Sequence, residues 1–200
     1  MVRIIKELPY NFNWKNRSET KYIVMHHIAA RVASVQDINT WHLRDNGWSG
    51  GIGYHLYIRK NGDVYEGRPL DVIGAHTRGW NHHSVGIALE GDFMQEYPSI
   101  HQIASAIEAI RHVKNIYGNI AILKHKDCNN DTTCPGIYFA EKIITEGKVN
   151  KMEQKHWCED IYTELVQKYE LKITERRFDE PIKRGEVFAL LKQVMEKIQK

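Results

Sequence analysis

Short apolar runs bounded by polar or turn residues predict the strands of a sheet. These runs cover residues 22–27, 54–59, 64–66, 84–90 and 120–123. The first run is rich in β-branched residues, which is typical of a buried central strand. Between the second and third runs, Asn61-Gly62 is the turn signal of a β-hairpin. Polar side chains that end or follow the first and last runs are therefore expected at strand ends.

Two capping boxes predict the helices that alternate with these strands. Ser34 and Asp37 form the first, with aspartate in place of the usual glutamate, and the helix that they open reaches about Asp45. Ser99 and Gln102 form the second, and the helix that follows them carries an apolar stripe. Strands that alternate with helices indicate an α/β fold, with a mixed central β-sheet flanked by helices.

The pattern changes toward the C-terminus. Residues 139–155 are polar and rich in Lys and Glu, and they predict a helix tail and a linker. Residues 156–169 and the stretch from Arg184 predict amphipathic helices that are too short to build much core alone. We therefore expect a main domain over residues 1–150 and a small helical appendage over 151–200. Such helices dock on the main domain, form a homodimer or bind a ligand.

Composition and charge exclude several classes of protein. Apolar residues make up 42% of the chain and charged residues 26%, as in an ordinary globular protein. The net charge of +3 is too small to indicate nucleic-acid binding. No apolar stretch approaches the roughly 20 residues that span a bilayer, and the N-terminus lacks the apolar core of a signal peptide. We expect no nucleic-acid partner, no membrane insertion and a cytoplasmic protein that something else releases to its site of action.

Two segments of the chain carry side chains of the types that bind zinc. His26 and His27 end the first apolar run, and His125 and Cys134 lie in a polar loop after the last one. Two imidazoles and one thiolate leave a fourth zinc position open for water, as in catalytic sites, whereas structural sites have four protein ligands. The odd number of cysteines, three, favours reduced thiols or a metal ligand over a disulfide framework. These residues indicate a hydrolase with one catalytic zinc ion.

Several sequence blocks, all in the same order, resemble one known family. The blocks are VYEGR at residues 64–68, GAHT at 74–77, GWN at 79–81 and SVGIALEGDF at 84–93. Over about residues 20–140 the chain resembles the N-acetylmuramoyl-L-alanine amidase and peptidoglycan-recognition-protein family, which includes amidases of the phage endolysin type. The resemblance implies a zinc enzyme that degrades the cell wall. It would cleave the amide between the lactyl group of N-acetylmuramic acid and the first L-alanine of the stem peptide of peptidoglycan.

The resemblance also implies roles for individual residues. The family's metal ligands fall on His26, His125 and Cys134. The family tyrosine falls on Tyr54, which would hydrogen-bond the attacking water or the tetrahedral intermediate. The donor to the oxyanion falls on Thr132, a type of contact that contributes about 3–4 kcal/mol in other hydrolases. Thr133 is the alternative, because the loop that leads to the cysteine is one residue longer than usual.

A loop rich in glycine carries candidate substrate-binding side chains. They are His76, Trp80 and Asn81. We expect them to form a groove wall that holds the glycan and the stem peptide, and the alternative is that they pack within their loop. The C-terminal helices resemble half of an S-layer-homology-like repeat, which suggests wall attachment or dimerisation.

The same scaffold allows functions other than lysis. One is a non-catalytic module that binds peptidoglycan, and another is a cytoplasmic amidase that recycles muropeptides. Recognition proteins typically lack the cysteine ligand, and this chain retains it, which favours the enzyme. The absent signal peptide suits a phage or prophage endolysin that is stored in the cytoplasm.

Overall fold

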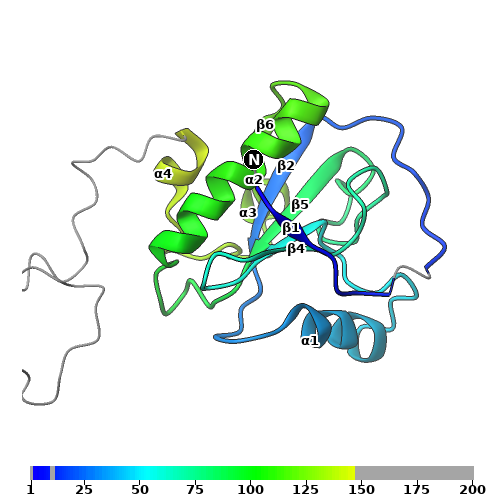
Figure 1. Ribbon diagram of the computed structural model, residues 1–200, viewed down its shortest axis with the longest axis horizontal. Coiled ribbons are helices and arrows are strands. Elements are labelled where there is room, and N and C mark those ends of the chain that lie inside the picture. Colours follow the sequence, from blue (N-terminus) through cyan, green and yellow to red (C-terminus); the bar gives the residue numbers. More distant parts are fainter. Residues whose placement is uncertain (1, 10–11, 147–200) are drawn as a thin grey trace, which may run out of the picture. The chain divides into compact units, whose positions relative to one another are not determined.

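The computed structural model describes residues 2–9 and 12–146 of the chain (Figure 1). All of them belong to a compact unit that extends over Met1–Lys148. The helices predicted in residues 151–200, with their possible roles in wall attachment and dimerisation, lie outside the described residues. Within those residues, no helix is both long enough and apolar enough to cross a membrane.

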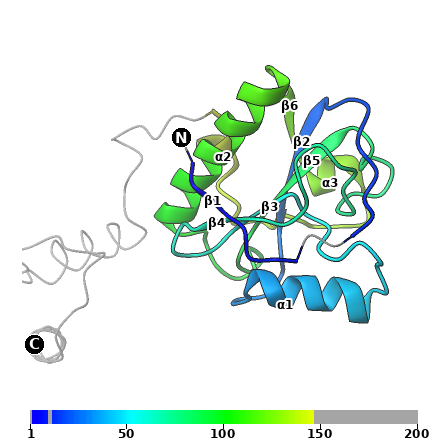
Figure 2. The same ribbon diagram turned by 45° about the vertical axis from the view of Figure 1, so that its right-hand side comes forward.

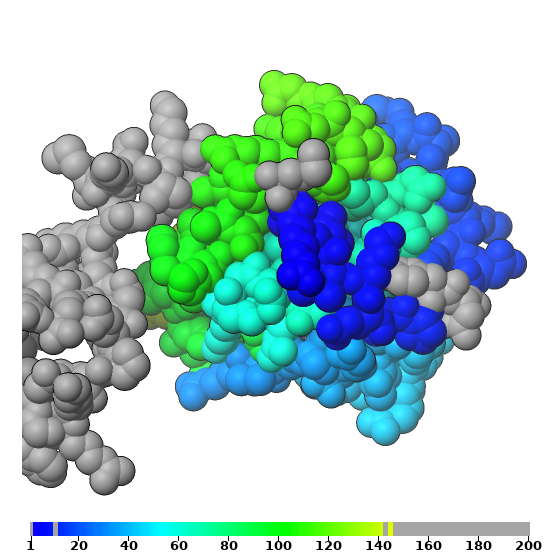
Figure 3. All heavy atoms as spheres, in the orientation of Figure 1, coloured from blue at the N-terminus to red at the C-terminus, as the bar shows by residue number. Residues whose placement is uncertain are grey.

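A six-stranded sheet forms the centre of this unit, in the order β1-β4-β3-β5-β2-β6. The strands are β1 (Ile4–Ile5), β2 (Tyr22–His27), β3 (Leu56–Ile58), β4 (Val64–Glu66), β5 (Ser84–Leu89) and β6 (Ala121–Lys124). All neighbouring pairs are parallel except the hairpin pair β3–β4. This mixed sheet confirms the prediction. The two-residue strand β1, which lies at the surface beside the hairpin (Figure 3), was not predicted, because two residues carry no periodicity.

Helices lie on both faces of the sheet (Figures 1 and 2). They are α1 (Val35–Thr40), which continues as the π-helix η1 (Trp41–Asp45), α2 (Ile100–Tyr117), α3 (His125–Cys128) and α4 (Glu141–Glu146). Both predicted capping boxes are present, at Ser34 with Asp37 and at Ser99 with Gln102. The first helix reaches Asp45 as expected, but its last turn is π-helical.

The alternation of side chains along the strands divides the core into two layers. Ile23 and Met25 of β2 face α2 and belong to the larger apolar cluster, together with apolar residues of that helix. The smaller cluster lies on the other face, where Val35 and Ile38 of α1 pack against Tyr57. His26 is offset by one residue from Met25, so it points to the face that α1 only partly covers.

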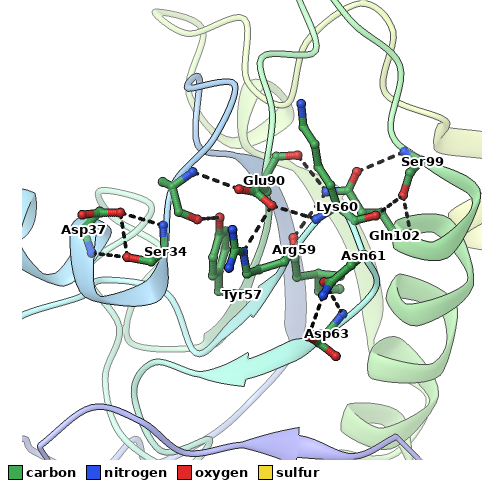
Figure 4. Close-up of polar contacts among 12 residues, drawn as sticks. Ser34, Asp37, Tyr57, Arg59, Lys60, Asn61, Asp63, Glu90, Ser99 and Gln102 are labelled. Carbon is green, nitrogen blue, oxygen red and sulfur yellow. Dashed lines mark hydrogen bonds and ion pairs between the residues drawn. The ribbon is translucent and has the colours of Figure 1, made fainter.

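A buried carboxylate ties the loops at one edge of the sheet together (Figure 4). Glu90, directly after β5, is 2% exposed. Its oxygens accept hydrogen bonds from the backbone N–H groups of Ala33 at 2.9 Å and Lys60 at 2.8 Å. The amide of Gln102 donates to the Glu90 carbonyl at 2.7 Å. The loops that follow β2 and β3 are thereby held at the carboxyl edge of the parallel strands, the edge at which ligands bind in such sheets.

The segment after β6 differs from the expected polar loop. His125 begins the four-residue helix α3. The Asp127 carboxylate accepts a hydrogen bond from the backbone N–H of Lys124 at 2.9 Å and so caps this turn. A single turn offers too few residues for a helical pattern to be recognised in the sequence.

Candidate metal centre

His26 lies near the carboxyl end of β2 and is 1% exposed. Its strand is hydrogen-bonded to β5 on one side and to β6 on the other, so the backbone is held from both sides. The neighbouring His27 points to the opposite face of the sheet. There its Nδ1 accepts a hydrogen bond from the backbone N–H of Phe93 at 3.0 Å, which makes it part of the core.

The register of two parallel strands brings His125 beside His26. Met25 of β2 pairs with Lys124 of β6, and the next residue in each segment is a histidine. The two imidazole rings are 4.7 Å apart, measured between their centroids. Residues far apart in sequence thus meet because β2 and β6 are neighbours in the sheet.

Cys134 returns to the same place through the loop after α3. Its carbonyl accepts a hydrogen bond from the backbone N–H of Lys126 at 2.9 Å. Its Sγ lies 3.6 Å from Nδ1 of His26. Two residues further on, Gly136 packs so closely on the backbone of Phe93 that a Cβ atom there would lie 2.4 Å from the Phe93 carbonyl carbon. The turn that carries the thiol is therefore seated directly on the loop after β5.

The three predicted ligands form one cluster that could hold a metal ion. The ligand atoms of His26, His125 and Cys134 all lie within 4.8 Å of one another. Tetrahedral zinc, with Zn–N near 2.0–2.1 Å and Zn–S near 2.3 Å, requires nitrogen and sulfur ligands to be about 3.6 Å apart. The separation between His26 Nδ1 and Cys134 Sγ meets this requirement. Nδ1 is therefore the ligand atom that His26 would offer.

The protonation states of these side chains also suit a metal ion. Burial lowers the pKa of both His26 and His125, which keeps the imidazoles neutral and their lone pairs available. Burial raises the pKa of the Cys134 thiol to about 12. A thiol with this pKa becomes a thiolate at neutral pH when a bound cation displaces its proton.

Tyr54 lies against the cluster from the segment that precedes β3. Its ring centroid is 5.2 Å from that of His26. The expected strand over residues 54–59 is shorter, since β3 begins at Leu56. Burial, and secondly the neighbouring Cys134, raise the pKa of the Tyr54 phenol well above its usual value. The phenol is therefore a hydrogen-bond donor at neutral pH.

A neighbour of Tyr54 was not identified from the sequence. His42 accepts a hydrogen bond at Nδ1 from the backbone N–H of Gly53 at 2.9 Å. Its ring lies 5.6 Å from the Tyr54 ring, between centroids. His42 thus positions the residue before Tyr54. No sequence signal links the two, because only the tertiary fold brings the end of the first helical segment to this strand.

The side chain of Thr132 is hydrogen-bonded to the backbone of Cys134. Its Oγ1 accepts a hydrogen bond from the N–H of Cys134 at 3.2 Å. Thr133 is exposed, and its carbonyl accepts from the N–H of Gly136 at 2.8 Å. The hydroxyl of Thr132 is thus the one attached to the cysteine turn. The role of either threonine toward an oxyanion stays a prediction.

His76 is buried beside His26. It is 7% exposed, and its Nδ1 is 3.1 Å from Nε2 of His26. The Asn81 amide oxygen accepts hydrogen bonds from the backbone N–H groups of His76 and Thr77, both at 2.9 Å. These contacts pack His76 and Asn81 within their loop, and a role of His76 toward substrate stays a prediction. The GAHT motif places an imidazole and a hydroxyl behind a predicted metal ligand.

Trp80 lies in the same loop and is half-buried. Its ring packs edge-on against Tyr22, with 5.1 Å between centroids, and also contacts His83. These contacts hold the loop on the start of β2. A role of Trp80 or Asn81 in substrate binding stays a prediction.

Comparison with known proteins agrees with the order of the sequence blocks. The family model described as N-acetylmuramoyl-L-alanine amidase matches residues 16–137, more than half of the chain. A solved structure of the N-acetylmuramoyl-L-alanine amidase LysC from Clostridium intestinale URNW is 36% identical, with a TM-score of 0.68, over 74% of this chain and 97% of that one. These findings confirm the resemblance and the fold inferred from the sequence.

Two curated relatives are similar to this chain at comparable identity. The endolysin of Enterobacteria phage K11 is 33% identical over 56% of this chain and 78% of its own length. Peptidoglycan-recognition protein SC2 of Drosophila melanogaster is 31% identical over 66% of this chain and 82% of its own length. The relatives therefore include both a lytic protein and a recognition protein.

Proposed function

The chain belongs to the N-acetylmuramoyl-L-alanine amidase family, and on this premise we propose that it is a zinc-dependent amidase of peptidoglycan. It cleaves the amide between the lactyl group of N-acetylmuramic acid and the first L-alanine of the stem peptide. The observation that carries the proposal is the cluster of His26, His125 and Cys134, whose ligand atoms lie within 4.8 Å of one another. This donor set leaves a tetrahedral ion one open position, which is typical of catalytic zinc.

The three proposed ligands would bind the metal ion with different charges. His26 and His125 offer neutral imidazoles, and Cys134 offers a thiolate that offsets part of the charge of a divalent cation. A bound zinc ion would polarise the scissile carbonyl and lower the pKa of a bound water toward about 7.

Two hydroxyl groups complete the proposed chemistry. Tyr54, a phenol that is protonated at neutral pH, donates a hydrogen bond to the attacking water or to the tetrahedral oxyanion. Thr132 already accepts a hydrogen bond from Cys134, so its own proton is free to point at the oxyanion. Removal of one such donor costs about 3–4 kcal/mol of transition-state stabilisation in other hydrolases.

The biological setting that we propose is host-cell lysis. Similarity to the endolysin of phage K11 supports a phage or prophage endolysin that is held in the cytoplasm and then released to the wall. Peptidoglycan, as glycan strand and stem peptide, is the proposed partner.

A second candidate is a peptidoglycan-binding module without activity. Similarity to a Drosophila recognition protein favours it. The complete three-ligand cluster argues against it, since a module that only binds has no need of a thiolate ligand at an open metal site.

A digestion experiment tests the proposal. Zinc-loaded protein is incubated with purified peptidoglycan, and released stem peptides with a new L-alanine amino terminus are measured by mass spectrometry. Cys134→Ala should abolish release. Cys128→Ala is the matched control, because Cys128 is a half-buried thiol at the end of the neighbouring helix α3 that does not belong to the cluster. Equal release by the unaltered protein and Cys134→Ala, or no release by either, would reject the amidase.

A further inference from the structure

Nε2 of His26, the ring nitrogen that faces away from Cys134, has two buried partners. While Nδ1 faces Cys134, Nε2 on the other side of the ring lies 3.1 Å from Nδ1 of His76 and 3.3 Å from Oγ1 of Thr77. Thr77 is 1% exposed, so water does not compete for these contacts. The hydroxyl of Thr77 is also 2.9 Å from His76 Nδ1, which closes a triangle of polar atoms behind the ring.

The position of this triangle is set by the fold. A Cβ atom on Gly74 would lie 2.5 Å from Cδ2 of His76, and one on Gly86 would lie 2.5 Å from its Cγ. Real side chains essentially never approach so closely, so both glycines are needed for the slot that the ring fills. The side-chain oxygen of Asn81 holds the backbone of His76 and Thr77 by accepting a hydrogen bond from each N–H group. The pair therefore stands in place independently of any metal ion.

The His76 ring contributes little polar stabilisation elsewhere. Its other nitrogen, Nε2, is buried and pairs with none of the described residues at hydrogen-bond distance, although the Ser84 backbone lies near enough to act on the ring. The side-chain polar groups that lie within hydrogen-bond distance of the ring belong to His26 and Thr77, and both face its Nδ1.

The tautomer of His26 connects this pair to metal binding. A neutral imidazole carries one proton, and a metal ion that takes the lone pair of Nδ1 requires that proton to be on Nε2. An acceptor placed at Nε2 favours this tautomer and fixes the plane of the ring. His76 Nδ1 and Thr77 Oγ1 are the atoms within reach.

We propose that His76 and Thr77 are positioning residues, which accept a hydrogen bond from the Nε2–H of His26 and so present Nδ1 to the metal ion. This inference rests on the metal centre of the proposed amidase. It gives His76 a role other than the groove wall expected from the sequence, and it adds Thr77, which was not singled out in the sequence.

The test compares two substitutions of similar shape in the full chain. His76→Asn places an amide oxygen near the position of Nδ1, whereas His76→Leu has the same branching without an acceptor. Zinc affinity is measured by competition with a chelating dye, and the absorption of the cobalt-substituted protein reports thiolate ligation and tetrahedral geometry. Outer partners of metal ligands contribute about 10–100-fold to affinity, so His76→Leu should weaken zinc binding by that factor and alter the cobalt spectrum. His76→Asn should restore most of the affinity.

The outcomes separate this inference from the proposed function. If the unaltered protein binds zinc and cleaves peptidoglycan but His76→Leu binds zinc equally well, only the positioning role is wrong. Equal weakening by Asn and Leu would assign His76 to packing and would also overturn it. Failure of the unaltered protein to bind zinc would overturn both proposals. If His76→Leu does not fold, as judged by metal-free thermal unfolding, the near-isosteric Thr77→Val decides, and unchanged zinc affinity there rejects the role.

Discussion

Substitution of Gly136 by alanine tests how the cysteine ligand is held. Gly136 has a φ of +101°, a conformation that costs an alanine about 1–2 kcal/mol. Its Cβ atom would also lie 2.4 Å from the carbonyl carbon of Phe93 and 2.5 Å from the oxygen. Both are backbone atoms, so the turn itself must retreat by about 1 Å to reach van der Waals contact.

That displacement matters because Cys134 lies two residues before Gly136. Metal sites keep ligand distances within about 0.2 Å, so a shift of about 1 Å in the turn removes the thiol from its productive position. We expect Gly136→Ala to weaken zinc binding at least tenfold, measured by competition with a chelating dye. We also expect it to lower the free energy of unfolding of the metal-free protein, measured in urea, by more than the conformational cost alone.

Gly118→Ala is the matched control. Gly118 also has a positive φ, +86°, but no atom lies within 4 Å of the position of its Cβ. With ψ at −171° as well, Gly118→Ala should lose about 1–3 kcal/mol of stability and keep its zinc affinity. If Gly136→Ala matched Gly118→Ala in both measurements, the claim that the turn is seated on Phe93 would be refuted.

Three further predictions concern Tyr54, the buried carboxylate and pH. Tyr54→Phe should lower kcat about 100- to 1,000-fold with unchanged zinc affinity, and an unchanged kcat would exclude the phenol from the reaction. Glu90→Gln should cost about 1–3 kcal/mol in urea unfolding, because one of the N–H donors of Ala33 and Lys60 would face an amide N–H (Figure 4), and a neutral result would contradict that reading. Burial lowers the pKa of His55 to about 3 from 6.5. Between these two pH values the unfolded chain binds a proton that the folded chain does not, so the free energy of unfolding decreases as the pH is lowered from 6.5 toward 3. Metal-free unfolding should show a slope of about 1.4 kcal/mol per pH unit from this residue, and His55→Gln should reduce it.

The sequence predicted most of the sheet and both long helical segments because their signals are local. The apolar run of β2, the Asn61-Gly62 turn and the two capping boxes each depend on residues within a few positions of one another. The strand β1 and the single turn α3 are too short to carry such a pattern, and the π-helical turn η1 differs from an α-helix only in its hydrogen bonds.

Residue chemistry and the order of the motifs predicted the three members of the cluster that could hold a metal ion. His26, His125 and Cys134 were chosen by type and by resemblance, and the described structure brings their ligand atoms within 4.8 Å of one another. The ligand atom of His26 could not be chosen from sequence, because it depends on which ring nitrogen faces the thiol.

The role of His76 depends on tertiary structure alone. In the sequence it is one histidine of a glycine-rich loop, equally compatible with a groove wall or with packing. The slot left by Gly74 and Gly86 and the 3.1 Å contact to His26 place it behind the cluster of predicted ligands. A sequence records which groups are available, but the direction of a ring and the atoms behind it result from the packing of strands that are distant along the chain.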